Sequence, residues 1–549
     1  MTLSWKVAMS RIDLFFRITV VLVGLTLVSR LIGFLRQVLM AGEFGLGWEL
    51  DAYVFAFQIP STLFLILPGA VNAIVIPVLK GMTGDGLQPE RNRLFHKLAT
   101  LTALALLLLA AAGMIWAQDI IRLLAPDFSP EKRELAGELL AIMMPSVLFI
   151  GLISLATAFL NAHDEFVAPS VGPILNGLMV IASIYLLAPF LGIRGIAWGT
   201  LAGFAVFALS LVAPMLRRRY TFRWNLAIAG DPVLRGMGER FVPILIGLLV
   251  SQLYLFMEKI LAGGLGDSKL SALWLAFSMV QLPIAIFSGA LAVPLFPLLS
   301  EYVKRHNLEG MKQVMARGFL YQYHVLLPAT VGLILLAEPF VRAFYGHGGK
   351  FGAEEAGLTA WAVIFYTVGM VGWAGRDLLT RASYALEDTK KPVFAAAAGL
   401  LLYIPLSFAL MPGMDHGGLA LAYALATYAN LLLQAWWLRR RIGRLFAPAF
   451  YASLGRGLFA AAAMGAAVVF MTRAAVRMNG AAPREPVYGA LKLLPDFPGG
   501  WTGIGWLAGI AAAAAVLYFG ILLVLGDPYV REMAARVKPG GGKSAKEVQ

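Results

Sequence analysis

The sequence predicts an all-α integral membrane protein with about fourteen membrane-spanning helices. Hydrophobic residues make up 59% of the 549 residues, charged residues make up 14%, and the mean hydropathy is +0.76. A soluble domain has about 45–50% apolar and about 25% charged residues, so lipid is the expected solvent. The apolar runs are about 20 residues long, which fits helices rather than the shorter alternating strands of a barrel.

The apolar runs give the expected spans, whose ends are placed only to within a few residues. Lys6 and Arg11 precede the first run, as in a signal peptide, but no small-residue cleavage site follows, so we expect a retained first helix. We expect the basic tail at 527–549 to be disordered. The spans cover roughly residues 14–39, 52–79, 98–118, 138–160, 167–190, 194–216, 241–263, 270–299, 319–344, 358–385, 393–411, 417–438, 457–472 and 502–525.

Positive charge is distributed unevenly between the two sets of loops. The net charge is +14, and loops after even-numbered spans contain "RRRYTFR" at 217–223 and "RRRIGR" at 439–444. The opposite loops hold about half as many lysines and arginines, so the positive-inside rule predicts that both termini are cytoplasmic. The chain has no cysteine, which excludes disulfides, thiolate metal sites and thiol nucleophiles.

An internal repeat divides the fourteen spans. "QIP" at 58–60 recurs as "QLP" at 281–283, an offset of 223, and "LRRR" at 216–219 recurs at 438–441, an offset of 222. Asp164 with its following Pro, in "FLNAHDEFVAP", corresponds to Asp388 in "YALEDTKKP" at an offset of 224. Six spans per copy is an even number, so both copies should have the same orientation in the membrane.

The repeat predicts four parts. These are an N-lobe at 1–223, a C-lobe at 224–445, two further helices at 446–526 and the cytoplasmic tail at 527–549. Two parallel six-helix halves suggest a transporter that rocks around a cavity between them.

Three arginines lie in the first span, where an ionisable side chain is costly and therefore a candidate functional residue. Arg17 is near the cytoplasmic end and Arg36 near the outer end, so either can extend its charge to the interface. Arg30 is only about 5 Å from the middle of the helix, where this is hardest. We therefore expect Arg30 to line a wet cavity with Arg36, and guanidinium groups there fit an anionic lipid-linked ligand.

Asp51 begins the second span, just after the polar stretch "EFGLGWEL". It can be a first-turn acid that favours the helix dipole. It can also be a gate partner for an arginine of the first helix. The sequence does not decide between the two.

The second half has further charges inside spans. Glu258 and Lys259 are adjacent, and so are Arg376 and Asp377, with Arg381 in the same span. Each adjacent pair can be a structural ion pair. Because neighbours on a helix point about 100° apart, each residue can also contribute singly to a cavity.

Helix breakers recur at matching places of the second and eighth spans. Pro60 and Gly69 lie in the second span, and Pro283 and Gly289 in the eighth. Proline inside a span is tolerated where packing satisfies the freed backbone groups. These positions are candidate hinges for a rocking transporter.

The sequence lacks the motifs that several functions require. There is no phosphate-binding Walker loop and no His/Glu metal constellation, so we expect no cofactor, no metal site and no enzymatic activity. A polyprenyl-phosphate glycosyltransferase would need clustered aspartates for a divalent metal or a large cytosolic catalytic loop. The sequence has neither, which argues against this class of membrane enzyme. A coupling ion is not identified by the sequence.

Three stretches resemble a known family. "SRLIGFLRQVLMAGEFG…LDAYVFAFQIP", "AFLNAHDEFVAPSVGPILNG" and "YGHGGKF…YTVGMVGWAGRDLLTRASYALEDTKKPV" are similar to signatures of the MurJ (MviN) lipid II flippases, within the multidrug/oligosaccharidyl-lipid/polysaccharide (MOP) exporter superfamily. The resemblance covers roughly residues 14–445. It implies a V-shaped pair of six-helix lobes in the bacterial cytoplasmic membrane. It also implies transfer of the undecaprenyl-pyrophosphate-linked peptidoglycan precursor to the outer leaflet, as part of cell-wall biogenesis and cell-shape maintenance.

The same resemblance implies site residues. Arg30, Arg36 and Asp51 fall on positions that the family uses as cavity charges. Where well-known members have arginines in the second and eighth helices, this chain has Phe64 and Ser278, and Gln37 replaces an acid. Lys259, Arg376 or Arg381 can substitute, or the substrate differs.

The alternatives are therefore a flippase for another polyprenyl-linked polysaccharide precursor and a cation-coupled drug exporter of the same superfamily. The drug exporter would need carboxylates in the middle of first-lobe spans, where this chain has arginine. We expect a monomer in the lipid bilayer, able to associate with cell-wall synthesis proteins, and no binding of nucleic acid.

Overall fold

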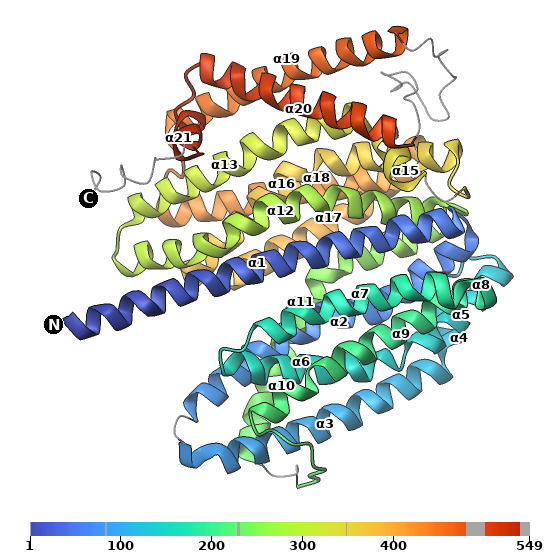
Figure 1. Cartoon of the computed structure of the whole chain (residues 1–549), viewed down its shortest axis with the longest axis vertical. Coiled ribbons are helices and arrows are strands. Elements are labelled where there is room, and N and C mark those ends of the chain that lie inside the picture. The colour runs from blue at the N-terminus through green and yellow to red at the C-terminus, as the bar shows by residue number, and fades with distance from the viewer. Residues whose placement is uncertain (1, 83–84, 228–230, 347–348, 479–499, 538–549) are drawn as a thin grey trace. The chain divides into compact units, whose positions relative to one another are not determined.

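The fold is described from a computed structural model of the chain (Figure 1). The structure describes residues 2–82, 85–227, 231–346, 349–478 and 500–537. The predicted long loop lies largely outside this part of the chain, as do residues 538–549 of the basic tail and the side chain of Arg17. The expectation of a disordered tail is wrong for its first part, because Pro528–Val537 forms a helix whose Val530 is buried in the apolar core. All regular structure in the described residues is helical, which confirms the predicted fold class.

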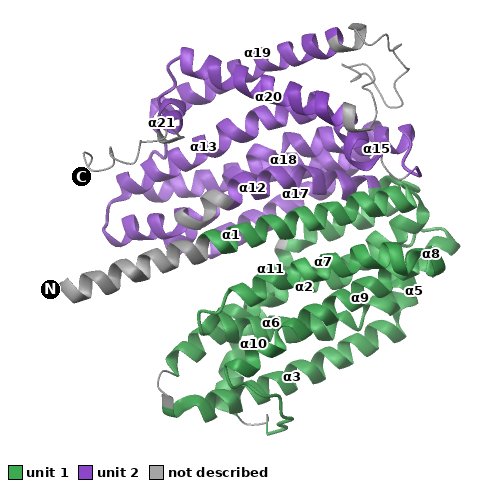
Figure 2. Cartoon of the chain, in the orientation of Figure 1, with its two compact units in different colours: residues 1–271 green, residues 272–549 purple. Residues whose placement is uncertain are grey.

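Two compact units make up the chain, residues 1–271 and 272–549 (Figure 2). Among its described residues, the first contains one 3₁₀ turn, Asp85–Leu87, and eleven helices. These are α1 (Thr2–Phe44), α2 (Trp48–Gly81), α3 (Gln88–Ile115), α4 (Ala117–Leu124), α5 (Pro130–Met143), α6 (Ser146–Ala162), α7 (Val167–Leu186), α8 (Ala188–Leu191), α9 (Ile193–Ser210), α10 (Val212–Arg217) and α11 (Pro232–Gly263).

The second unit begins at Ala272, within the first turn of α12, and contains the remaining helices of the described chain. These are α12 (Lys269–Lys304), α13 (Leu308–Leu335), α14 (Ala337–Tyr345), α15 (Ala353–Val368), α16 (Met370–Ala385), α17 (Lys390–Met414), α18 (His416–Ile442), α19 (Pro448–Met478), α20 (Gly500–Val524) and α21 (Pro528–Val537).

The compact units divide later than the sequence repeat. The repeat separates the lobes at 223/224, whereas the units separate at 271/272 because α11 packs with α2 in the first unit. A Cβ built on Gly69 of α2 would lie 3.3 Å from Leu248 Cδ1 of α11, so the glycine permits this close packing. The division into lobes by repeat remains a prediction.

The membrane-crossing helices agree with the expected number. Among the described residues, eleven helices are long and apolar enough to cross a membrane, or up to fourteen when each of three bent pairs counts as one span. The pair α5–α6 bends by 40° and the pair α15–α16 by 42°. The first break is at Met144 and Pro145, where the proline removes a backbone donor, and the second is at Gly369.

The two helix breaks lie at equivalent positions of the sequence repeat. Gly369 follows Pro145 by 224 residues, close to the sequence offset. A Cβ on Gly369 would lie 3.1 Å from the Ala424 Cα of α18, so the second break brings two backbones together. The repeat predicted from matches in the sequence is thus also present in helix geometry.

Positive φ angles recur at a constant spacing as well. Gly192 has φ 58° and ψ −140°, and Asp415 has φ 54° and ψ −139°. Gly45 (φ 67°) corresponds to Ser268 (φ 71°), and Asp164 (φ 58°) to Glu387 (φ 61°). Each pair is 223 residues apart. Left-handed conformations are uncommon for residues other than glycine, so three such pairs support a duplicated structural unit.

The helices outside the repeat join the core of the second unit. Leu320 and Leu327 of α13 pack in one apolar cluster with Met464 of α19 and Leu522 of α20. Buried His324 of α13 connects this cluster by polar contacts, because its ring nitrogens lie 2.9 Å from the Ser453 hydroxyl and 3.2 Å from the Tyr518 hydroxyl.

Candidate functional site

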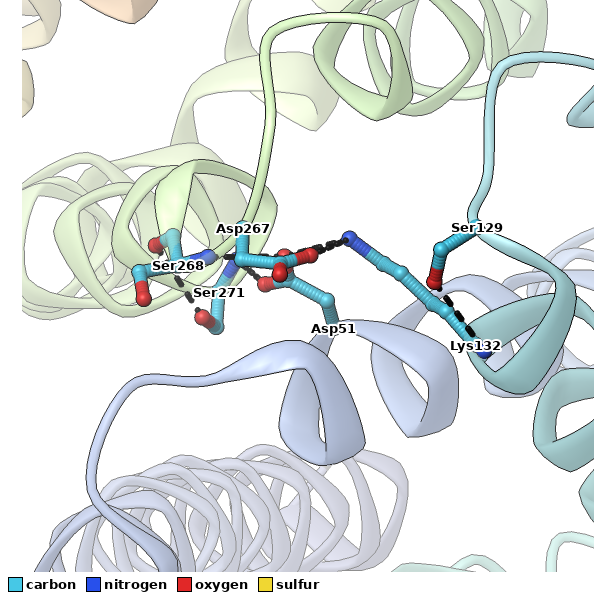
Figure 3. Close-up of polar contacts among 6 residues, drawn as sticks. All are labelled: Asp51, Ser129, Lys132, Asp267, Ser268 and Ser271. Carbon is cyan, nitrogen blue, oxygen red and sulfur yellow. Dashed lines mark hydrogen bonds and ion pairs between the residues drawn. The ribbon is translucent and has the colours of Figure 1, made fainter.

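Asp51 is the centre of a buried polar cluster at the start of α2. Its side chain is 0% exposed. Oδ1 accepts the Ser271 backbone N–H at 2.7 Å, and Oδ2 accepts the Ser268 backbone N–H at 2.9 Å. The carboxylate therefore lies at the turn between α11 and α12, where it accepts backbone donors at the N-terminus of α12 (Figure 3). A helix N-terminus favours a negative charge at this place.

Lys132 supplies the positive charge of the cluster. Its Nζ lies 2.8 Å from Asp51 Oδ2 and 3.0 Å from Asp267 Oδ1, and the side chain is only 2% exposed. Nζ is also 4.5 Å from the centre of the Phe128 ring. Figure 3 shows the ammonium group reaching the two carboxylates from α5. The lysine thus links α2, α5 and the turn before α12.

Local sequence places Lys132 in the first turn of α5. Ser129 precedes the helix and its hydroxyl accepts the Lys132 backbone N–H at 3.3 Å, and Pro130 has the fixed φ suited to a first helical residue. Lys132 was not among the residues predicted from the sequence. It lies in the mixed-charge stretch "PEKRELAGELL", where nothing distinguishes a buried lysine from its exposed neighbours.

The position and the contacts of Asp51 bear on its two predicted roles, a first-turn acid and a gate partner for an arginine of the first helix. Asp51 lies in the first turn of α2, as the helix-dipole interpretation expects. Among the described contacts its cationic partner is Lys132 rather than Arg30 or Arg36. The arrangement is a fixed ion pair in this structure, with two carboxylates sharing one ammonium group.

The two arginines of α1 differ in their surroundings. Arg30 is exposed, and it makes no ion pair among the described residues. Arg36 is half-buried, its guanidinium lies 5.8 Å from the centre of the Phe57 ring, and its Nε has no hydrogen-bond partner within the described chain. Two cationic groups with free donors in a membrane span are suited to an anionic ligand.

The charges of the second half form the expected adjacent pairs. Lys259 Nζ donates to Glu258 Oε1 at 3.0 Å, and both side chains are buried. Arg376 donates to Asp377 Oδ1 at 3.0 Å with both side chains partly exposed. Arg381 is half-buried. Their role as cavity charges remains a prediction.

Phe64 and Ser278 stand where the resemblance implies arginines. Phe64 contacts other aromatic rings, and Ser278 bonds within its own helix. Phe64 packs edge-on against Phe204 and Phe207, with ring centres 5.3 and 6.3 Å away. The Ser278 hydroxyl donates to the Trp274 carbonyl at 2.9 Å within α12. Buried Gln37 lies one residue after Arg36. None of these side chains has a charge for a pyrophosphate.

The candidate hinges lie inside continuous helices. Pro60 and Gly69 are within α2, and Pro283 and Gly289 are within α12. The bends of more than 40° found in the described chain occur elsewhere, in α5–α6, α11 and α15–α16. Motion at the four residues stays a prediction.

The fold is similar to that of transporters of the MOP superfamily. A solved multidrug resistance MATE transporter of that superfamily, inward-facing, matches with a TM-score of 0.62 and 15% identity, covering 76% of this chain and 95% of its own. A solved structure of lipid II flippase MurJ, inward closed, matches with a TM-score of 0.75 and 21% identity, covering 92% of this chain and 100% of its own. At these identities the two structures show the fold.

The sequence narrows the class to one family. The model of the family "Lipid II flippase MurJ" matches residues 40–483. The lipid II flippase MurJ of Burkholderia cenocepacia is 27% identical over 535 residues, which cover 94% of this chain and 98% of that protein. A probable lipid II flippase MurJ of Buchnera aphidicola is 29% identical over 418 residues, covering 74% and 81%. This chain belongs to the MurJ lipid II flippase family.

Proposed function

We propose that this protein flips lipid II, the undecaprenyl-pyrophosphate-linked peptidoglycan precursor, from the cytoplasmic to the outer leaflet of the bacterial inner membrane. The observation that carries the proposal is the family match over residues 40–483. The relatives that cover almost the whole chain have this activity in their names.

The lipid would be transported by alternating access, in which a cavity opens first to one side of the membrane and then to the other. The pyrophosphate group would bind near Arg30 and Arg36, because guanidinium groups form paired hydrogen bonds with phosphate oxygens. An exposed Arg30 without an ion pair among the described residues supports this role, since a free charge facing lipid is costly. The polyprenyl tail would stay in lipid, and the transport step would need no covalent chemistry and no cofactor.

The membrane topology and assembly belong to the same proposal. Both termini would be cytoplasmic, because the basic loops follow even-numbered spans. The protein would act as a monomer that can associate with cell-wall synthesis proteins. Membrane potential or an ion gradient would drive the cycle.

Complementation tests the proposal. Cells depleted of their own lipid II flippase should grow when they express this chain, and should not grow with Arg30→Ala or Arg36→Ala at equal protein levels. Arg194→Ala is the matched control, because that arginine is exposed and pairs with Glu138 at the surface. Failure of the well-expressed wild-type chain would reject lipid II as substrate. Growth with both α1 variants would reject the arginine site.

A second substrate remains a candidate because of Phe64 and Ser278. Their partners are aromatic rings and a helix carbonyl, so neither position can replace the arginines that the resemblance implies. Another polyprenyl-linked polysaccharide precursor would need a different distribution of charges. Reconstituted protein should be assayed for flipping of lipid II and of an undecaprenyl-pyrophosphate carrying another glycan. Transport of the second lipid alone would favour this alternative.

A further inference from the structure

Residues 217–226, here called the basic segment, have the sequence RRRYTFRWNL. They begin with the last residue of α10 and the turn that ends it, and residues 220–226 continue without regular secondary structure. Tyr220 anchors the segment in the first unit. Its side chain is 1% exposed, and its ring lies 5.1 Å from that of Phe159 and 5.5 Å from that of Phe95. Its position is therefore fixed by the core.

Backbone groups of the basic segment are held along α3. The Arg218 carbonyl accepts from Gln88 Nε2 at 3.3 Å, and the Thr221 carbonyl lies 2.7 Å from His96 Nε2. The Asn225 N–H donates to Thr100 Oγ1 at 3.0 Å. These contacts follow α3 in chain order, so the segment runs beside the helix instead of leaving its surface.

The outer side of the basic segment is apolar. Phe222, Trp224 and Leu226 alternate along the extended chain and are 49%, 63% and 74% exposed. The rings of Phe222 and Trp224 meet edge to face with centres 5.0 Å apart. In an extended chain alternate residues point to the same side, so the three side chains form one surface.

Along α3, this surface lies at the boundary between the polar and the apolar part of the helix. Gln88 and Thr100 are twelve residues apart, which is about 18 Å of helix. The segment therefore runs from the polar end of α3 to the point where Leu98 and Leu101 begin its apolar part. Aromatic side chains are enriched at this boundary because their rings suit its mixed polarity.

The charge of the basic segment has one sign. Four of its ten residues are arginine and none is acidic. Arg218 pairs with Glu165 at 3.6 Å, the one ion pair that its arginines make within the described chain. Arg217, Arg219 and Arg223 are exposed. Such a cluster attracts anionic lipid at a membrane surface.

The second repeat shows what covers the corresponding position there. Leu445, 223 residues after Phe222, is only 7% exposed. The next residue, Phe446, stacks on Phe450 of α19 with ring centres 4.0 Å apart. Leu445 packs in an apolar cluster with residues of α12, α13, α16 and α18, and α19 contacts the neighbouring Phe446, so the second copy is buried. Nothing in the described chain covers the first.

We propose that the basic segment is a binding surface for anionic phospholipid. Phe222, Trp224 and Leu226 insert among the headgroups, and Arg217, Arg219 and Arg223 bind lipid phosphates. The proposal concerns bulk membrane lipid and does not depend on which substrate the protein carries. A protein partner on the same apolar surface is the competing outcome.

A single cysteine can test the insertion, since the chain has none of its own. Leu226→Cys carries a polarity-sensitive fluorophore, and Arg305→Cys, in a basic loop of the second unit, is the control. In phosphatidylcholine vesicles containing phosphatidylglycerol, brominated lipid should quench the label at 226 and aqueous iodide should not. The label at 305 should show the opposite. A label at 226 that stays iodide-accessible in vesicles but is shielded in native membranes would indicate a protein partner and overturn the proposal.

Lipid retention tests the arginines. Arg219→Gln with Arg223→Gln should lower the ratio of phosphatidylglycerol to phosphatidylcholine retained on the purified protein by roughly tenfold or more, because each arginine at an anionic surface changes binding by about fivefold. Lys304→Gln with Arg305→Gln removes the same charge elsewhere and should leave most of the retention. Equal retention by the two double variants would refute the assignment.

Discussion

The Lys132 ammonium lies 2.8 Å from the Asp51 carboxylate, with side-chain exposures of 2% and 0%. Ion pairs removed from water in this way contribute little net stability when intact. They cost a great deal when one partner is removed, because the other charge stays buried. The cluster at the start of α2 is therefore sensitive to single substitutions.

Lys132→Met should destabilise the protein by about 3–5 kcal/mol, because it leaves Asp51 and Asp267 without their shared cation. Thermal unfolding in detergent measures the effect. Adding Asp51→Asn to Lys132→Met should restore part of the loss, and the double-mutant cycle gives the coupling between the two residues. The control is Arg194→Met, which breaks an exposed pair with Glu138 and should cost at most about 1 kcal/mol. Equal costs for Lys132→Met and the control would contradict the buried ion pair.

Gly192 and Asp415 have the same backbone angles but not the same residue. Gly192→Ala should destabilise by about 1–3 kcal/mol, because φ 58° with ψ −140° is a region that side chains disfavour. No atom lies within 4 Å of a Cβ built there, so the cost would come from the backbone alone.

Asp415→Gly is the reciprocal change. It should raise the unfolding temperature, because it relieves the same strain. Gly81→Ala, at a glycine without positive φ and without atoms near its Cβ, controls for the loss of glycine. If Gly192→Ala and Gly81→Ala unfold at the same temperature, the strain is absent.

Acid should weaken the attachment of α11 to α3. The hydrogen bond from the Lys97 side chain, followed by the backbone N–H groups of Leu234 and Val233, holds the pKa of Asp231 below its usual 3.8 against the opposing effect of burial. A carboxyl with a lowered folded-state pKa contributes stability above its unfolded pKa, and the contribution is lost as pH falls through the folded value. Stability should therefore fall below about pH 4.

Asp231→Asn isolates this contribution. Asparagine still accepts the backbone N–H groups at the helix start but has no charge for Lys97. The variant should be less stable than wild type at neutral pH, and the difference should shrink in acid. Unfolding temperatures across the pH range measure this. A difference that does not change with pH would exclude the ion pair as its cause.

Phe64→Arg restores a charge at a position where the resemblance implies one. The guanidinium would meet the rings of Phe204 and Phe207, so we expect a lower unfolding temperature and no gain in flipping. Ser278→Arg, at a half-buried site where the hydroxyl donates to the Trp274 carbonyl, is the comparison. Increased lipid II transport by Phe64→Arg would show that the site accepts the family's charge after all.

The spans and the repeat could be predicted because they depend on composition and spacing. About 20 apolar residues are needed to cross a bilayer, and this pattern is visible without contacts. The break at Gly369 was not predicted, since it depends on the close approach of Ala424. The division of the units at 271 likewise follows from packing of α11 on α2.

The candidate site was predicted only in part. Asp51 was found because it begins an apolar span just after a polar stretch and falls on a position that the resemblance implies. Its partner was missed, because Lys132 is distant in sequence and lies among ordinary surface charges. Burial of a lysine depends on which carboxylates the fold brings to it, and a single sequence contains no direct signal of that.

The matched turns at Gly192 and Asp415 also bear on the origin of the chain. Torsion angles that agree to within a few degrees at a fixed spacing are what fusion of two copies of one gene would leave behind. The ancestral product would have been a six-helix protein that paired with an identical copy. The backbone follows the same path at both turns, although one turn has glycine and the other has aspartate.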